Sequence, residues 1–272
     1  MLGGGPHRVP RVSRNSRSPS TVGGEQVEGR HAVRELLQAG RRDVKEVWLA
    51  DHREAAPILE EINEAAASRG VRIRTVSRVR LDETARTESP QGVVAFAAPL
   101  VGVELDELSG PVTGNDGVPF LLVLDGITDP QNLGALLRTA VCAGVTGVVL
   151  PRHRATHVTP AVTKAAAGAI EHVPIAVVPG IPSGLARLRE AGVWSVGLDV
   201  SGPVALWDLE VATEPVALVL GAEGRGLSRL TRERCDLLVH IPQRAALNSL
   251  NVSAAGAIAC FEVCRRRRPS VH

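Results

Sequence analysis

The feature that most constrains the fold is a regular alternation of strand-like and helix-like segments between residues 118 and 268. The first segment, Phe120–Leu124, is a nearly continuous apolar run, which is typical of a central parallel strand buried on both faces. Further strands are expected near 145–150, 173–178, 194–198, 216–220 and 237–241, and helices near 133–143, 160–169, 185–191, 227–233 and 254–266. This alternation predicts an α/β domain with a mainly parallel sheet covered by helices.

A second, smaller α/β unit is predicted over residues 25–99. Its first helix carries apolar residues on one face from Ala32 to Leu37 and is expected to end at Gly40. The other expected elements are a strand at 44–50, a helix from Pro57 to Gly70, and strands at 71–76 and 92–98. Four arginines between 72 and 80 make this unit locally basic, which fits either an RNA-binding surface or an ordinary solvated face.

The remaining segments have little to bury. Residues 1–24 are rich in Gly, Ser, Pro and Arg and predict a disordered basic tail, and residues 100–117 predict an interdomain linker. The run from Arg265 to Arg268 is either a second basic arm that contacts RNA phosphates or merely solvated charge.

Composition excludes several classes of protein. No apolar run approaches the roughly 18 residues that span a bilayer, and no signal-peptide core is present, so we expect a cytoplasmic protein without membrane contact. The four cysteines show no C-x-x-C spacing and predict reduced thiols. His153 and His157 are spaced like zinc ligands, but no third ligand accompanies them, so no metal site is expected.

Three clusters at strand ends can carry chemistry, and the first is Asp125–Gly134 followed by Arg138. The capping preference of Asn132 places it at the start of a helix, from which Arg138 would point back toward the same end. These two side chains are then expected to share a pocket. The alternative is a plain asparagine cap with a solvated arginine.

The second cluster is Gly221-Ala222-Glu223-Gly224-Arg225-Gly226. Its order, G-x-x-G-x-G, differs from the dinucleotide fingerprint, and no Gly-Lys-Ser/Thr follows it, which argues against NAD and ATP sites. What it offers is a carboxylate, Glu223, in a backbone that can approach a ligand closely.

The third cluster follows the strand that ends at Ile241-Pro242, and it comprises Ser249-Leu250-Asn251-Val252-Ser253. Ser253 is expected to cap the last helix. Ser249 and Asn251 come just before it, and their density in an apolar segment favours a ligand contact.

Together, Asn132-x-Gly134-Ala135-x-x-Arg138, Gly221-x-Glu223-x-x-Gly226 and Ser249–Ser253 resemble the three motifs of the SpoU/TrmH branch of the SPOUT RNA 2′-O-ribose methyltransferases. The likeness is greatest to 23S rRNA guanosine 2′-O-methyltransferases. It implies a C-terminal parallel-sheet domain with a deep trefoil knot over 118–268, a small N-terminal RNA-binding α/β domain over 25–99, and a homodimer. It also implies an S-adenosylmethionine site with backbone contacts at Gly221, Ile241 and Leu250, and catalytic roles for Asn132, Arg138, Glu223, Ser249 and Asn251.

The resemblance leaves the RNA substrate open. The most similar proteins imply 23S rRNA, and the alternatives within the same chemistry are a tRNA methyltransferase or an antibiotic-resistance rRNA methyltransferase. A non-enzymatic rRNA-binding protein is the alternative from another class. The five intact polar residues of the three motifs speak against it, because a protein that only binds RNA does not need all of them.

Overall fold

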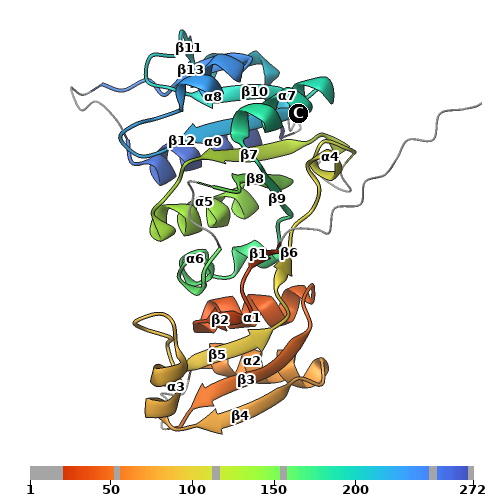
Figure 1. The fold of residues 1–272 in the computed structure, drawn as a ribbon, viewed down its shortest axis with the longest axis vertical. Coiled ribbons are helices and arrows are strands. Elements are labelled where there is room, and N and C mark those ends of the chain that lie inside the picture. Colours follow the sequence, from red (N-terminus) through yellow and green to blue (C-terminus); the bar gives the residue numbers. More distant parts are fainter. Residues whose placement is uncertain (1–20, 52–55, 112–116, 154–157, 245–249, 269–272) are drawn as a thin grey trace, which may run out of the picture.

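The computed structural model describes residues 21–51, 56–111, 117–153, 158–244 and 250–268. Two α/β domains are stacked along the long axis of the molecule, with the N-terminal domain at one end and the C-terminal domain at the other (Figure 1). In the part of the chain that is described, no helix has the length and apolar character needed to cross a membrane.

The first domain is built on a four-stranded sheet in the order β2-β5-β3-β4. These strands are Gln26–Glu28 (β2), Val44–Ala50 (β3), Arg72–Val76 (β4) and Val93–Ala97 (β5). Helices Arg30–Ala39 (α1) and Pro57–Ser68 (α2) pack on one face, whereas Arg78–Thr84 (α3) covers part of the other. The sequence predicted β3 with these bounds, and α1 ends at Gly40, whose φ of 67° favours glycine. Helix α3, which Ser77 caps, was not predicted.

The second domain contains a seven-stranded sheet in which every pair of neighbouring strands is parallel, with the order β11-β13-β10-β12-β7-β8-β9. Its strands are Phe120–Asp125 (β7), Gly147–Pro151 (β8), Ile175–Val178 (β9), Trp194–Leu198 (β10), Val204–Ala205 (β11), Val216–Gly221 (β12) and Leu237–His240 (β13). The predicted parallel sheet is therefore confirmed.

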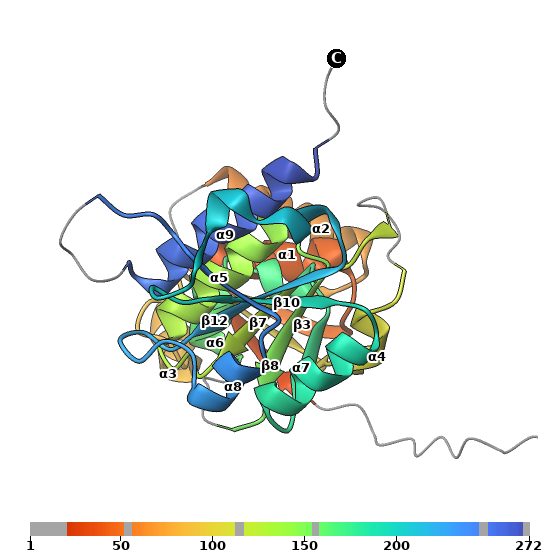
Figure 2. The same cartoon turned by 90° about the horizontal axis from the view of Figure 1, so that it is seen from above.

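Helices cover both faces of this sheet, as Figure 2 shows. Pro130–Cys142 (α5) and Val252–Arg266 (α9) lie side by side on one face, and Ile181–Glu190 (α7) and Arg229–Arg234 (α8) lie on the other. Strand β7 is buried on both faces because Leu122 and Leu124 pack with the first layer, and Leu121 and Val123 with the second. Helix Pro160–Ala165 (α6) and the short helices Ala169–Glu171 (η2), Leu206–Asp208 (η3) and Glu210–Thr213 (η4) complete the domain.

Two segments that were expected to lack structure are ordered where the structure describes them. Thr21–Gly23 (β1), at the end of the expected tail, pairs with Leu100–Val101 (β6), at the start of the expected linker. Helix Leu105–Leu108 (α4) follows. The physical reason is burial, because Leu100, Leu105 and Leu108 pack into the cores of the second domain. Residues 1–20 and 112–116 lie outside the described residues.

The C-terminal arginines have a structural role, which corrects the expectation of a basic arm or of freely solvated charge. Arg265 and Arg266 pair with the carboxylate of Glu262. Arg267 donates to the carbonyl oxygens of four residues in two separate segments of the chain. These are Val118 and Pro119 in the first segment, and Ala212 and Glu214 in the second. Its guanidinium also lies 5.1 Å from the centre of the Phe120 ring. Arg267 thus fastens the end of α9 to the rim of the sheet.

Replacing Arg267 with methionine is therefore expected to lower the free energy of unfolding by about 2–3 kcal/mol, because several carbonyls lose a charged donor. The measurement is a urea unfolding curve of the whole protein. Arg268→Met is the matched control, since Arg268 is exposed, and it is expected to change stability by less than about 0.5 kcal/mol. Equal midpoints for the two variants would contradict the structural role of Arg267.

Candidate functional site

A cavity of about 450 Å³ opens at the carboxyl ends of β10, β12 and β13. In parallel α/β sheets this edge is where ligands bind. Apolar side chains form part of its wall, namely Leu198, Leu220, Val239, Ile241, Leu250 and Val252. Polar groups lie among them: Asp199, Ser201, Glu223, Arg225, Arg232, His240 and Gln243. The three residues expected to contact a cofactor, Gly221, Ile241 and Leu250, all line this cavity.

A triangle of hydrogen bonds joins the three sequence motifs at this edge. Asn132 Nδ2 donates to Glu223 Oε2 at 3.0 Å, and Asn251 Nδ2 donates to Asn132 Oδ1 at 3.0 Å and to Glu223 Oε1 at 3.3 Å. Of the three, only Glu223 also lines the cavity. The two amides therefore hold the Glu223 carboxylate in a fixed orientation at the cavity wall.

Helix capping places both asparagines, in a way the sequence indicated only in part. Helix α5 is capped by Asp129, whose carboxylate accepts from the backbone N–H groups of Gln131 and Asn132, so Asn132 lies within the first turn instead of at the cap. Helix α9 is capped by Asn251 and not by Ser253. Asn251 Oδ1 accepts from the Ser253 N–H and Oγ–H, which leaves Asn251 Nδ2 free to reach the triangle.

The glycine-rich turn approaches its own backbone closely. A Cβ atom on Gly221 would lie 2.0 Å from the carbonyl carbon of Gly226 and 2.2 Å from the nitrogen of Leu227. Gly226 N–H donates back to the Ala222 oxygen, and Gly224 and Gly226 have φ angles of 76° and 66°. Gly221 has no room for a side chain and the φ angles of the other two favour glycine, so the three glycines allow this turn, which presents Glu223 to the cavity.

Arg138 does not share a pocket with Asn132, contrary to the sequence-based expectation. It lies on an exposed face of α5, does not line the cavity, and forms no hydrogen bond or ion pair with any described residue. Six positions along a helix place it about a third of a turn around the axis from Asn132. Ser249, the remaining predicted catalytic residue, lies outside the described residues.

Sequence reasoning missed the polar side chains that the loop after β10 brings to the cavity. Asp199 accepts hydrogen bonds from the Ser201 N–H and Oγ–H, and Arg232 donates to Ser201 Oγ at 2.6 Å. Burial opposes the charged form of Asp199, but the Ser201 hydrogen bonds, aided by Arg232, hold its pKa below the ordinary value. The signal was available, since Asp199 directly follows a predicted parallel strand and so belongs at the same sheet edge.

The cavity has the apolar wall and the few polar side chains of an organic-ligand pocket. Among the residues that the structure describes, no group of three or more His, Cys, Asp or Glu side chains could hold a metal ion. Burial raises the pKa of Cys235 and of Cys260 to about 12, so both thiols are protonated at neutral pH. His157 lies outside the described residues.

Comparison with known families covers both domains. Residues 119–261 match the SpoU rRNA Methylase family, and residues 26–101 match the family described as RNA 2'-O ribose methyltransferase substrate binding. All three motifs and the cavity lie in the first match.

Individual proteins show the same similarity. The chain is 40% identical over 245 residues to the 23S rRNA (guanosine-2'-O-)-methyltransferase RlmB of Pseudomonas aeruginosa, covering 90% of this chain and 98% of that protein. Identity to the RlmB protein of Shewanella oneidensis is 42% over 243 residues, covering 88% and 96%. Among solved structures, the SpoU methyltransferase AviRb from Streptomyces viridochromogenes, in complex with the cofactor AdoMet, is similar with a TM-score of 0.72, 26% identity and 89% of each chain covered.

Proposed function

The chain belongs to the SpoU rRNA methylase family of RNA 2′-O-ribose methyltransferases, and we propose that its substrate is a nucleotide of 23S rRNA. As a member it is an enzyme that uses S-adenosylmethionine as methyl donor. The choice of 23S rRNA is supported by relatives of that name, which match nearly the whole chain. This membership also argues against the alternative of a non-enzymatic RNA-binding protein. Because the proposed substrate is ribosomal RNA, we place the enzyme's action in the cytoplasm.

The observation that carries the proposal is the hydrogen-bonded triangle of Asn132, Glu223 and Asn251 beside the cavity. The cavity suits S-adenosylmethionine because it combines an apolar wall for an adenine ring with charged groups for an amino-acid end. A Cβ atom on Gly224 or Gly226 would meet no other atom within 4 Å, so the backbone of both residues is open to a ligand. We infer cofactor contacts at Gly221, Ile241 and Leu250, which line this wall.

The chemistry requires alignment more than acid–base power. S-adenosylmethionine would supply an electrophilic methyl group to the ribose 2′-oxygen, in line with its C–S bond, so that S-adenosylhomocysteine leaves and the hydroxyl proton passes to solvent. The triangle fixes the Glu223 carboxylate as an acceptor that orients the ribose. From the likeness of its motif, we also assign Ser249 a role in orienting the ribose. A guanidinium offers hydrogen-bond donors and no acceptor. We therefore assign Arg138 to hold the ribose hydroxyl and to stabilise the negative charge that develops on oxygen.

The isolated chain places Arg138 away from the cavity, and a homodimer resolves this. In the proposed dimer, Arg138 of one protomer completes the cavity of its partner. Support comes from two adjacent helices: Gln131, Arg138 and Cys142 are exposed on α5, and Phe261 is 47% exposed on α9. Exposed aromatic and arginine side chains on neighbouring helices are typical of a subunit interface.

We also propose the deep trefoil knot of the family. In support, strand β13 pairs between β10 and β11, toward one edge of the sheet, and the chain then returns to pack α9 against α5. A chain that inserts a late strand between two earlier ones and then crosses back is compatible with threading through a loop.

Two measurements on the whole protein test the proposed function. Calorimetric titration is expected to show S-adenosylmethionine binding, and absence of binding would contradict the assignment of the cavity. Mapping of 2′-O-methyl groups in total RNA, from cells with and without the protein, is expected to reveal one 23S rRNA position that depends on it. A dependent position in tRNA alone would overturn the proposed substrate while leaving the chemistry intact.

A further inference from the structure

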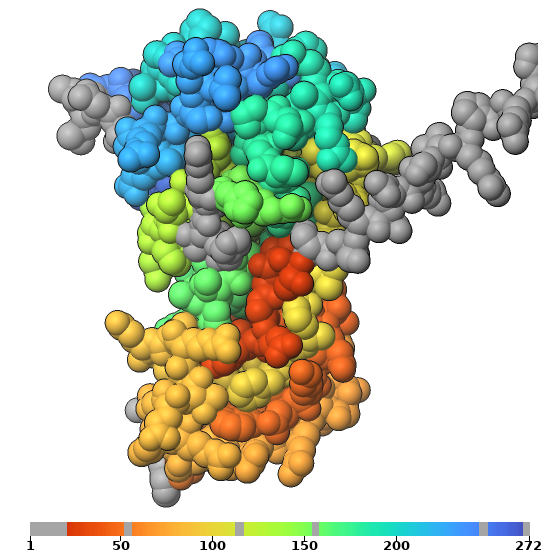
Figure 3. Space-filling view, viewed as in Figure 1, coloured from red at the N-terminus to blue at the C-terminus, as the bar shows by residue number. Residues whose placement is uncertain are grey.

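The two domains meet at a waist, where Figure 3 shows red residues, from the start of the described chain, beside green residues of the second domain. A buried ion pair crosses this contact. Arg42 of the first domain and Glu171 of η2 lie 2.9 Å apart, with side chains that are 3% and 0% exposed. Two domains of one chain normally move relative to one another unless their interface is large and hydrophobic, so a buried ion pair at this place requires an explanation.

Arg42 holds both chain crossings between the domains. Its Nε donates to the carbonyl oxygen of Ala98 at 2.6 Å, and its Nη2 donates to that of Gly24 at 2.6 Å. Gly24 lies where the described chain enters the first domain, and Ala98 lies where it leaves. A planar guanidinium with three fixed donor directions, each occupied, allows one relative orientation of the parts that it joins.

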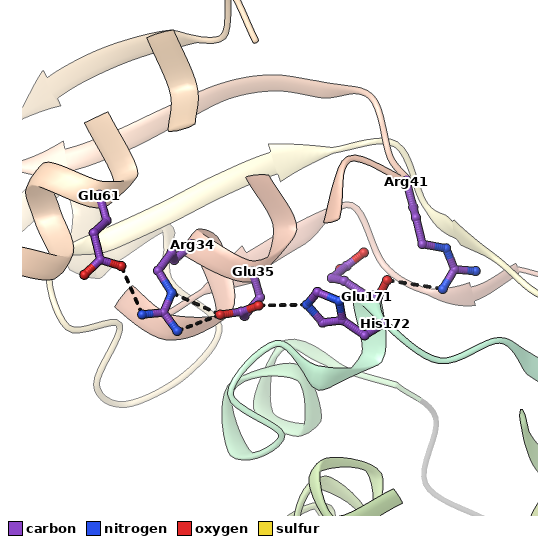
Figure 4. Close-up of polar contacts among 6 residues, drawn as sticks. All are labelled: Arg34, Glu35, Arg41, Glu61, Glu171 and His172. Carbon is purple, nitrogen blue, oxygen red and sulfur yellow. Dashed lines mark hydrogen bonds and ion pairs between the residues drawn. The ribbon is translucent and has the colours of Figure 1, made fainter. Parts of the chain in front are cut away.

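Further contacts between the two domains lie around Glu171, and Figure 4 shows those of Arg41, Glu35 and His172. Arg41 Nη1 donates to the backbone oxygens of Glu171 and Val173, and His172 Nε2 lies 2.7 Å from Glu35 Oε2. Gly168, with a φ of 84°, lets α1 approach so closely that a Cβ there would lie 2.5 Å from the Glu35 Cβ. We call Arg41, Arg42, Glu35, Glu171 and His172 the domain latch.

The buried ion pair of the domain latch tolerates little change in its geometry. Glu171 Oε2 is buried and accepts no hydrogen bond from any described residue, and burial raises the pKa of this carboxyl although Arg42 opposes the rise. A well-packed apolar contact is often as stable as a buried ion pair, but it does not fix orientation as strictly. Stability alone is therefore a weak reason for placing such a pair between two domains.

A rigid path leads from the latch to the methyl-transfer site. Glu171 belongs to η2, which follows α6, and α6 packs against Gly134 in the helix that carries Asn132. A Cβ on Gly134 would lie 2.4 Å from the Ala165 Cβ, so these two helices are in backbone contact at that point. The orientation of the first domain is thus coupled to the site through packed helices, without a long flexible loop between them.

From this geometry we propose that Arg42 and Glu171 are positioning residues, which hold the first domain at one orientation so that bound RNA delivers one particular ribose to the Asn132–Glu223 site. The proposal rests on the proposed function, since it assumes that the first domain binds the substrate RNA. Selection of the target nucleotide then depends on two things. One is the distance between the RNA-binding first domain and the Asn132–Glu223 site, which the domain latch fixes, and the other is the set of contacts at the reacting ribose.

The test compares Glu171→Leu with Glu171→Gln, which keeps an oxygen acceptor for Arg42. Small-angle X-ray scattering of the whole protein reports the domain arrangement, calorimetry reports S-adenosylmethionine affinity, and methyl mapping on a 23S rRNA transcript reports the product. For Glu171→Leu we expect a more extended molecule, unchanged cofactor affinity, methyl groups spread to neighbouring riboses, and kcat/KM at the target lowered roughly tenfold to a hundredfold. Glu171→Gln is expected to restore the single product.

Glu61→Gln is the matched control, because Glu61 pairs with Arg34 in the same network but within the first domain. If Glu171→Leu fails to fold, Arg42→Lys replaces it, since a lysine cannot reach Glu171, Ala98 and Gly24 together. A variant with a loosened arrangement that still methylates the single target at the wild-type rate would overturn the proposal, as would an unchanged arrangement in both variants. Failure of the wild-type protein to methylate rRNA would instead contradict the proposed function, and scattering would still show whether the latch holds the domains.

Discussion

An Arg138→Ala variant is expected to lose methyl transfer by about a hundredfold to a thousandfold, the usual loss when one group that stabilises developing charge is removed. S-adenosylmethionine affinity is expected to stay near that of the wild type, because the proposed role of Arg138 is toward the ribose hydroxyl and not toward the cofactor. Single-turnover transfer of labelled methyl groups to 23S rRNA is the measurement. Arg229→Ala removes an arginine that is 82% exposed on the same domain and serves as the control.

A mixed dimer shows whether Arg138 acts across the interface. One protomer carries Arg138→Ala, and its partner carries Asn132→Ala with Glu223→Gln, so that each is inactive as a homodimer. If Arg138 completes the partner's cavity, the mixed dimer contains one intact site and regains about half of the wild-type rate, since one of two sites works. Mixed dimers as inactive as both parents would contradict the arrangement, and near-normal transfer by Arg138→Ala itself would remove Arg138 from the mechanism.

The second large effect is expected for Gly221→Ala. The added Cβ would lie about 2 Å from backbone atoms of Gly226 and Leu227, which cannot yield as a flexible side chain would. The turn must open, which moves Glu223 away from its two amide partners and distorts the cavity wall. We expect loss of measurable S-adenosylmethionine binding and destabilisation by about 1–3 kcal/mol.

Calorimetric titration and thermal unfolding of the same preparation separate these two effects. Gly180→Ala is the matched control, since the nearest atom to its Cβ position is 3.9 Å away and its φ is −162°. The control is expected to bind S-adenosylmethionine as the wild type does. A Gly221→Ala variant with wild-type affinity would show that the close turn is dispensable for the cavity.

The sequence by itself determined the elements and which strand ends carry polar clusters. Strand β3 has the predicted bounds, and β12 ends within one residue of the prediction. Burial on one or both faces of a strand requires a regular pattern of apolar residues, and that pattern is visible in the local sequence. The order of the three motifs was enough to show the family. Short elements such as α4 and β1 escaped prediction, since each is stabilised by contacts with distant segments and not by its own pattern.

The tertiary structure decided which polar groups meet. Glu223 lies 91 residues from Asn132 and 28 from Asn251, and the three meet because β12 pairs with β7 and α9 packs beside α5. The same packing turns Arg138 outward and engages Arg267 with carbonyl oxygens, where sequence reasoning expected a shared pocket and a free basic run. Arg42 and Glu171, 129 residues apart, carry no local signal at all. Hydrophobic periodicity is a property of residues that are neighbours along the chain, so the sequence determined the elements. The partner of a polar side chain is a residue distant in sequence that the fold brings close, so only the tertiary structure decided the contacts.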